Sequence, residues 1–307
     1  MRKAYLYLHI SILLWGFTGI FARAIDLSEG VLVWYRLLLT SICWIGIALI
    51  TNKVRILPVK EILRISFVGL LVAVHWLFFY GSIKYSNISV GMSCLAMIAV
   101  FSSILEPFIT GRKFQWFELL LGLFAAFGMF LIFEFSSEYR TGILLGLISA
   151  LLGSYFTIRN KQLMGVYNSE TVTTYELCSG FVYLTLLMPI YLWLFPAGNL
   201  MPESQDWLLL IIFTVVCTVI PFNLSMKALK HLSAFTSNLS INMEPVYGIC
   251  LAFIFYHEQK ELHPGFFAGT AIILLSVVIY MVLKYRQLLK KKIMTEGDLD
   301  DVGLPSK

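Results

Sequence analysis

Residues 116–135, WFELLLGLFAAFGMFLIFEF, contain no charged side chain between Glu118 and Glu134. A helix needs about 20 predominantly apolar residues to cross the hydrocarbon core of a bilayer, and this stretch supplies them. Apolar runs of this kind occupy residues 4–23, 31–51, 62–83, 86–109, 116–135, 141–161, 172–195, 206–229, 233–256 and 265–285. Each run is longer than a strand of a membrane barrel requires, and open strands would leave unpaired backbone groups in hydrocarbon. The sequence therefore predicts an all-α polytopic membrane protein with ten transmembrane helices.

The composition of the whole chain leads to the same fold class. Of its 307 residues, 59% are hydrophobic and 13% are charged, whereas soluble domains are typically about 45–50% apolar and about 25% charged. So few charges cannot cover a water-facing surface of this size, which excludes a soluble enzyme, a secreted module and a disordered chain. The five cysteines all lie inside apolar runs without metal-ligand or redox spacing, so we interpret them as small packing residues.

The basic residues set the predicted orientation. With a cytoplasmic N-terminus, 18 of the 23 Lys and Arg residues fall in cytoplasmic segments, four fall outside, and Arg36 lies within a span. Because cytoplasmic loops carry the excess of Lys and Arg, we expect both termini in the cytoplasm and the protein in the cell (inner or plasma) membrane. Residues 286–307 combine three lysines at 290–292 with a polar, acidic end, which we interpret as a disordered cytoplasmic tail.

Short motifs recur in the same order in the two halves of the chain. The pairs are Gly16 and Gly153 at an offset of 137 residues, Tyr35-Arg36-Leu37 and Tyr175-Glu176-Leu177 at 140, and Ser82-Ile83-Lys84 and Ser225-Met226-Lys227 at 143. Offsets that drift slowly and in order indicate a repeat of five spans. Since five is odd, the second copy must enter the membrane upside down, as in secondary transporters whose substrate site lies near the midplane. We predict a first five-helix repeat over residues 1–138 and a second, inverted five-helix repeat over residues 139–285.

Four motifs resemble those of a known transporter superfamily. They are Leu13-Leu14-Trp15-Gly16, Tyr35-Arg36, Glu244-Pro245-Val246 and His257-Glu258. Together they resemble the drug/metabolite transporter superfamily, and most closely its EamA-type family of ten-span carriers, over residues 4 to about 285. The resemblance implies export of amino acids, other metabolites or drugs, often in exchange for protons. One departure is the second Glu-Pro pair, Glu106-Pro107, whose offset from Glu244 does not match the surrounding repeat.

Polar residues inside the ninth predicted span share one broad helical face. This face carries Ser237, Asn238, Ser240, Asn242 and Glu244, at spacings of three, four and seven residues. A face this polar cannot point at lipid, so it either lines a cavity or hydrogen-bonds a neighbouring helix. Ionisable groups in hydrocarbon are candidate functional residues, and we favour cavity lining with Glu244 as a proton or cation site.

Aromatic and polar residues in other spans reach a similar depth. His75 suits proton coupling because its unperturbed pKa is near neutrality, although it could equally be a neutral core histidine with one partner. Aromatic rings could form the walls of a substrate pocket or simply fill the bundle. The predicted substrate cavity comprises Trp15, Thr18, His75, Trp76, Tyr80, Tyr155, Asn223, Asn238, Asn242 and Glu244.

Three further charged residues are gate or interface candidates. Arg36 either extends to the outer interface, which we favour, or attracts an anionic substrate there. Glu176 occupies the corresponding position at the opposite leaflet, so we expect the two not to pair. Glu106 is either a cytoplasmic gate or a charge at a helix end in water.

The function we predict is secondary active transport by alternating access. The cargo would be a small metabolite, amino-acid-like, amine-like or possibly a drug, exported with proton coupling. The alternatives are a flippase for lipid or lipid-linked substrates and a membrane-embedded enzyme. The sequence argues against the enzyme, because residues 257–263 lack the zinc-protease spacing. We expect no cofactor, metal or nucleic acid; the partners are a small-molecule substrate and membrane lipid. Small residues at Gly142, Gly146, Ala150, Gly265 and Gly269 allow close helix packing within a monomer or across a homodimer.

Overall fold

Helices form all the regular secondary structure that can be described. The computed structural model describes residues 2–111, 113–135, 137–229, 240 and 243–301, and these contain no β-strand. Eight segments are helical, long and apolar enough to cross a membrane. They are α1 with α2 (Arg2–Gly16, Thr18–Ala24), α3 (Glu29–Thr51), α4 (Val59–Lys84), α5 with α6 (Ile88–Leu95, Met97–Thr110), α7 (Trp116–Phe135), α8 (Arg140–Met164), α9 (Ser169–Leu194), and α10, η2 and α11 (Ser204–Thr214, Val215–Val219, Ile220–Leu229). These segments coincide with eight of the ten predicted spans.

The last two predicted spans correspond to shorter apolar helices. Of the predicted run 233–256, the helix α13 (Glu244–Tyr256) is described, while residues 230–239 and 241–242 lie outside the described part. After the short turn η3 (Glu258–Lys260), α14 (Pro264–Asp301) has an apolar portion over Pro264–Tyr280. A further short turn, η1 (Ser137–Tyr139), precedes α8.

The end of α14 differs from the predicted disordered tail. The helix continues from its apolar portion through Asp301, so residues 286–301 are helical. Leu, Lys and Gln dominate the first part of this extension and are good helix formers. An existing helix also extends without the cost of a new nucleus.

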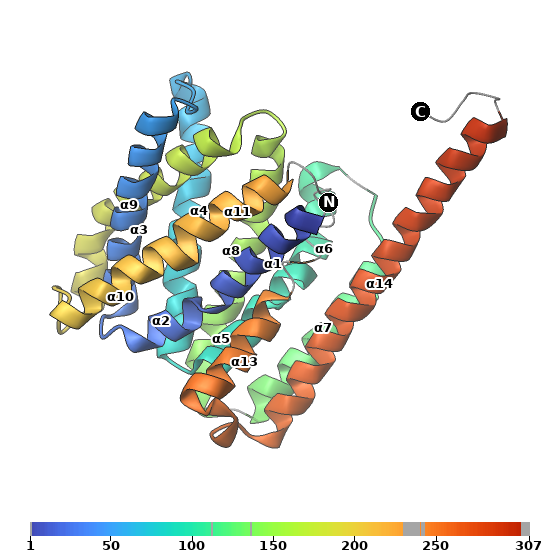
Figure 1. Ribbon diagram of the computed structural model, residues 1–307. Coiled ribbons are helices and arrows are strands. Elements are labelled where there is room, and N and C mark those ends of the chain that lie inside the picture. Colours follow the sequence, from blue (N-terminus) through green and yellow to red (C-terminus); the bar gives the residue numbers. More distant parts are fainter. Residues whose placement is uncertain (1, 112, 136, 230–239, 241–242, 302–307) are drawn as a thin grey trace.

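The helices pack as a main bundle with one pair along its edge (Figure 1). Helices α3, α4 and α9 pack together, α4 also packs along α8, and α1 lies against α11 and α13. Helix α14 pairs with α7 beside this bundle. The largest buried apolar cluster joins residues from α2 to α5 with residues from α9, α10 and α13.

Small residues make close contacts inside the chain. A Cβ added at Gly146 on α8 would overlap Cys94 of α5 and Ser82 of α4. One added at Gly269 on α14 would overlap the backbone of Gly128 on α7. At these positions the stripes of small residues serve intramolecular packing.

Three of the long apolar segments are interrupted, one of them at Ala96, which separates α5 from α6. The first helix breaks at Phe17, which separates the seven-residue helix α2 from α1. The eighth segment contains a π-helical turn over Val215–Val219, directly before Pro221. Such π-turns occur frequently at functional sites, and a proline removes the hydrogen bond to the carbonyl four residues earlier.

We predict that Gly69→Ala destabilises the protein and Gly46→Ala does not. A Cβ at Gly69 on α4 would overlap the backbone oxygen of Glu176 on α9, so the two helices would have to separate. Overpacking of this kind costs about 1–3 kcal/mol. Gly46 on α3 has no atom within 4 Å of an added Cβ, so alanine there stabilises the helix by up to about 1 kcal/mol.

Thermal unfolding of the purified variants in detergent measures this difference. The melting temperature of Gly69→Ala should fall, while that of Gly46→Ala should stay the same or rise. Equal changes in the two variants would contradict close packing of α4 on α9 at Gly69.

Candidate functional site

A buried arginine on α3 occupies the interior of the helix bundle. The residue Arg36 is 3% exposed, so it does not extend to the outer interface, and that favoured interpretation is wrong. Its guanidinium carbon lies 4.0 Å from the ring centroid of Trp76 and 4.4 Å from that of Phe213. Aromatic faces attract a cation, and the attraction is larger where water is excluded. The rings therefore hold the charge of Arg36 at a depth where it would otherwise be very costly.

Hydrogen bonds complete the surroundings of the guanidinium. Arg36 donates from Nε and Nη2 to Oγ1 of Thr218, at 3.0 and 2.8 Å, and from Nη1 to the hydroxyl of Tyr80. Its Nη2 also donates to the carbonyl of Cys217 at 3.4 Å. That carbonyl is the one that Pro221, four residues later, cannot satisfy. The proline thus removes the usual α-helical donor to this carbonyl, and Arg36 donates to it instead.

A balancing charge for Arg36 comes from the other half of the chain. Glu244, at the start of α13, interacts electrostatically with Arg36, yet the two do not form a direct ion pair. Tyr247, one turn further along α13, lies against Gly16 of α1, and the neighbouring Trp15 packs edge-on against Phe222 of α11 at 5.8 Å. Glu244 is therefore near the meeting point of α1, α11 and α13.

The histidine of the predicted site is held by Ser149 of α8. In α4, His75 is 6% exposed, and its Nδ1 lies 2.8 Å from the carbonyl oxygen and 2.9 Å from Oγ of Ser149. The imidazole also stacks on Phe79 and meets Phe156 edge-on. These contacts fit the structural alternative for His75, a neutral core histidine held by one neighbour.

The other predicted cavity residues divide into three groups. Trp76 and Tyr80 contact Arg36 directly, and Thr18 is buried on α2 without a hydrogen-bond partner for its hydroxyl. Tyr155 instead accepts a hydrogen bond from Arg159 at 3.2 Å, and Asn223 is exposed. Asn238 and Asn242 lie outside the described residues.

The two acidic gate candidates each have a partner on α8. Glu106 of α6 forms an ion pair with Lys161 at 2.8 Å. Glu176 of α9 is 7% exposed and accepts a hydrogen bond from Asn160 at 2.9 Å. Glu176 is thus held apart from Arg36, in agreement with the prediction that these two residues do not pair. Among the described residues, no group of three His, Cys, Asp or Glu side chains could hold a metal ion.

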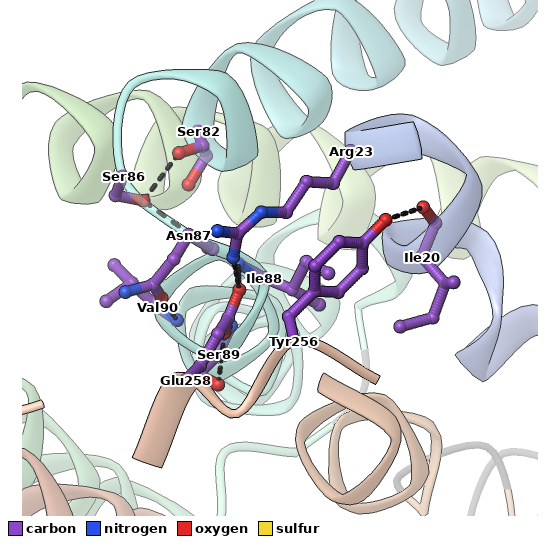
Figure 2. Close-up of polar contacts among 10 residues, drawn as sticks. All are labelled: Ile20, Arg23, Ser82, Ser86, Asn87, Ile88, Ser89, Val90, Tyr256 and Glu258. Atoms are coloured by element: carbon purple, nitrogen blue, oxygen red, sulfur yellow. Dashed lines mark hydrogen bonds and ion pairs between the residues drawn. The ribbon is translucent and has the colours of Figure 1, made fainter. Parts of the chain in front are cut away.

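A second polar cluster, at one end of the bundle, was missed by the sequence analysis (Figure 2). Glu258 is fully buried, accepts hydrogen bonds from the backbone N–H of Ile88 and Ser89 at 3.0 and 2.8 Å, and accepts a third from the Ser89 hydroxyl at 2.6 Å. Arg23 of α2 pairs with the same carboxylate at 2.6 Å, and its guanidinium covers the ring of Tyr256. We call Arg23, Tyr256, Glu258 and Ser89 the end cluster.

The end cluster satisfies the start of α5. The first helical N–H groups of any helix lack partners within the helix, and a carboxylate there is favourable. Here Glu258 accepts from Ile88 and Ser89, while the side chain of Asn87 accepts from Val90 at 2.9 Å. Asn87 is a sequence signal for a helix start, but no sequence pattern places Glu258 beside it.

Comparison with known proteins identifies the family of this chain. The profile of the EamA-like transporter family matches residues 2–134 and again residues 140–282. The chain belongs to the EamA-like transporter family. Like other EamA-like proteins it is a multi-pass membrane protein with a transport function.

Two relatives of this EamA-like protein carry transporter names. The uncharacterized transporter YxxF of Bacillus subtilis (strain 168) is 21% identical over 281 residues, which cover 86% of this chain and 87% of the relative. An uncharacterized transporter of Archaeoglobus fulgidus is 23% identical over 298 residues, covering 91% of this chain and 96% of the relative. One crystal structure shares the fold, with a TM-score of 0.62 and 14% identity over 91% of this chain and 98% of that one.

We predict that Tyr80→Phe lowers the stability of this EamA-like protein. The substitution removes the hydroxyl that accepts from the buried charge of Arg36, and hydrogen bonds to charged groups are worth about 1.5–3 kcal/mol. Thermal unfolding in detergent should show a lower melting temperature. The control is Tyr5→Phe, which removes a hydroxyl from a side chain that is 40% exposed on α1. If both variants have the melting temperature of the wild type, the hydroxyl of Tyr80 does not stabilise Arg36.

Proposed function

We propose that this EamA-like protein is a secondary active transporter that exports a small amino-acid-like or amine-like metabolite by alternating access, driven by protons. One observation carries the proposal: the buried guanidinium of Arg36, from the first half, has the half-buried carboxylate of Glu244, from the second half, within electrostatic range in an apolar helix bundle. Ionisable residues at such positions are costly and typically mark a substrate or ion pathway. A site with one cation and one anion suits a substrate that carries both charges.

The proposed architecture is ten spans in two inverted five-helix repeats, residues 1–138 and 139–285, with both termini in the cytoplasm. The family profile supports the repeat because it matches the chain twice in succession. The packing of the helices supports the repeat too. In the first half α1 belongs to the first segment and α4 is the third, and in the second half α8 is the first segment and α11 belongs to the third. The third segment of the first half packs on the first of the second (α4 on α8), and the first of the first half packs on the third of the second (α1 on α11). Inverted repeats of this kind are a feature of secondary transporters.

Helix α2 is the proposed gate at one end of the bundle. Arg23, near the C-terminal end of α2, forms an ion pair with Glu258. Phe21, half a turn earlier, stacks on Phe213 with 5.5 Å between ring centroids, and Phe213 in turn lies under Arg36. If α2 moves away, the ring that covers Phe213 moves with it, and the surroundings of Arg36 open toward that end.

Glu244 is the proposed proton-coupling residue, with His75 as the second candidate. Glu244 lies one turn before Tyr247, which packs against Gly16, and within electrostatic range of Arg36, so a change in its protonation would alter the charge that a bound substrate meets. His75 lies on α4 and is held by Ser149. Its contacts make a packing role the better-supported alternative.

We predict that Glu244→Gln uncouples transport from protons without abolishing exchange. Glutamine keeps the size of the side chain but can neither release nor take up a proton. In proteoliposomes with an imposed pH gradient, addition of L-amino acids should change the pH inside the wild-type vesicles, measured with a trapped dye. Glu244→Gln should show no such change, while exchange of labelled for unlabelled substrate continues.

Two controls make the coupling test specific. Glu134→Gln changes an exposed carboxylate on α7 and should retain proton movement. His75→Gln should also retain it if His75 is a packing residue. Unchanged pH-driven transport in Glu244→Gln would remove this residue from the coupling role, and loss of coupling in His75→Gln would transfer that role to His75.

We also predict that Arg23→Gln opens the end of the bundle at α2. The substitution removes one partner of Glu258 and leaves the backbone partners of α5 in place. A partly exposed ion pair contributes about 1 kcal/mol, which corresponds to a roughly fivefold shift in the open population. The thiol of Cys217, buried beside Arg36, reports on this opening when the other four cysteines are replaced by serine.

The rate of Cys217 modification by a charged methanethiosulfonate is the measurement. It should rise in Arg23→Gln and return toward the wild-type value in Arg23→Lys, which keeps the charge. Arg140→Gln is the matched control, because Arg140 lies over Phe133 and outside the end cluster. An unchanged rate in Arg23→Gln would exclude α2 as the gate.

A further inference from the structure

A small cavity between α4 and α8 is lined by two arginines from different helices. It has a volume of about 110 Å³ and is bounded by Arg64, Phe67 and Val68 of α4 and by Arg159, Gln162 and Leu163 of α8. We call it the two-arginine pocket. Its floor belongs to the buried apolar cluster around Val68 and Leu163, whereas Phe67 is 48% exposed. The pocket therefore has an apolar wall that continues onto the outer surface of the bundle.

The two positive charges that line the two-arginine pocket have no negative charge among the other lining residues that the structure describes. Among the described residues, Arg159 donates to neutral groups of its own helix, Gln162 and the hydroxyl of Tyr155, both at 3.2 Å. Arg64 has a distant ionic contact of 3.8 Å with Glu61, whose carboxylate also accepts from Tyr167 at 2.8 Å. Two guanidinium groups thus share a cavity in which like charges repel unless an anion lies between them.

The position of the pocket indicates which class of anion it binds. It lies where α4 begins and α8 ends. The segments at these helix ends carry many basic residues, including Lys53, Arg55, Lys60 and Lys161. Guanidinium groups match the geometry of phosphate oxygens better than an ammonium does. Basic pockets between transmembrane helices bind phospholipid head groups on the cytoplasmic side of membranes.

We propose that the two-arginine pocket binds a phosphate group, and that its source is the head group of an anionic phospholipid. The guanidinium groups of Arg64 and Arg159 hold the phosphate oxygens from two sides. Phe67, exposed next to them, packs against the glycerol and the first acyl carbons of the lipid. A free phosphate ion would use the same arginines and would gain nothing from Phe67. The site is separate from the transport site, so the proposal stands or falls independently of the proposed function.

Lipid binding to the purified full-length protein tests the proposal. The protein is delipidated in dodecyl maltoside and titrated with phosphatidylglycerol, phosphatidylcholine or inorganic phosphate, and binding is followed by native mass spectrometry and by the melting temperature. We expect phosphatidylglycerol to bind and to raise the melting temperature, with phosphatidylcholine and inorganic phosphate giving much smaller effects. Arg64→Gln/Arg159→Gln should bind phosphatidylglycerol about tenfold more weakly, which corresponds to about 1.4 kcal/mol.

Matched variants separate the pocket from general electrostatics. Arg55→Gln/Lys60→Gln removes the same charge from exposed positions at the beginning of α4 and should bind like the wild type. An equal loss of binding in the two double variants, or no binding by the wild type, would overturn the proposal. Should either double variant misfold, Arg159→Lys keeps the charge, loses the planar fork and should bind with intermediate affinity.

Phe67→Ser distinguishes the two sources of phosphate. It should weaken binding of phosphatidylglycerol and leave that of inorganic phosphate unchanged. Tight binding of inorganic phosphate that is indifferent to Phe67→Ser would support the phosphate site and overturn the lipid as its source.

Discussion

Backbone polar groups inside a membrane protein must find partners within the protein, because hydrocarbon offers none. Continuous helices meet this requirement by themselves, whereas helix starts and interruptions do not. At the start of α5 the free donors are N–H groups, and the buried carboxylate of Glu258 accepts from them. Before Pro221 the carbonyl of Cys217 lacks its usual α-helical donor, and the guanidinium of Arg36 donates to it. At both of these places a backbone group is satisfied by a charge of the appropriate sign.

Both contacts join segments that are far apart in the sequence. Arg36 and Thr218 are 182 residues apart, and Ser89 and Glu258 are 169 apart. In each case one partner lies in the first half of the chain and the other in the second. The same groups that satisfy the backbone therefore also hold the halves together, and the stacked pair Phe21 and Phe213 connects the two clusters.

The sequence predicted the helical segments well and the polar contacts poorly, for a physical reason. Exposure to lipid demands a continuous apolar run, which is a local property of the sequence, so eight predicted spans coincide with long apolar helices. The depth of Arg36 depends on Trp76, Phe213 and Thr218, which no local pattern brings together. In the sequence, Glu258 lies in a short polar turn between two apolar helices. Only the structure shows that it accepts hydrogen bonds from the start of α5. His75 shows the limit of residue type alone, since a histidine inside a span fits a titrating role, whereas its contacts with Ser149 favour a packing role.

In the proposed alternating access, each buried charge keeps some of its partners when a contact between the two halves is broken. If the halves separate at Arg36, the residue loses Thr218 and Cys217 but keeps Tyr80 and Trp76, which belong to its own half. If α2 releases Glu258, the carboxylate keeps the N–H groups of α5. A buried charge left with no partner costs several kcal/mol, whereas one that keeps part of its surroundings costs much less. The remaining partners thus lower the free energy of the state in which one contact is broken, and a transporter that must populate that state repeatedly needs this property.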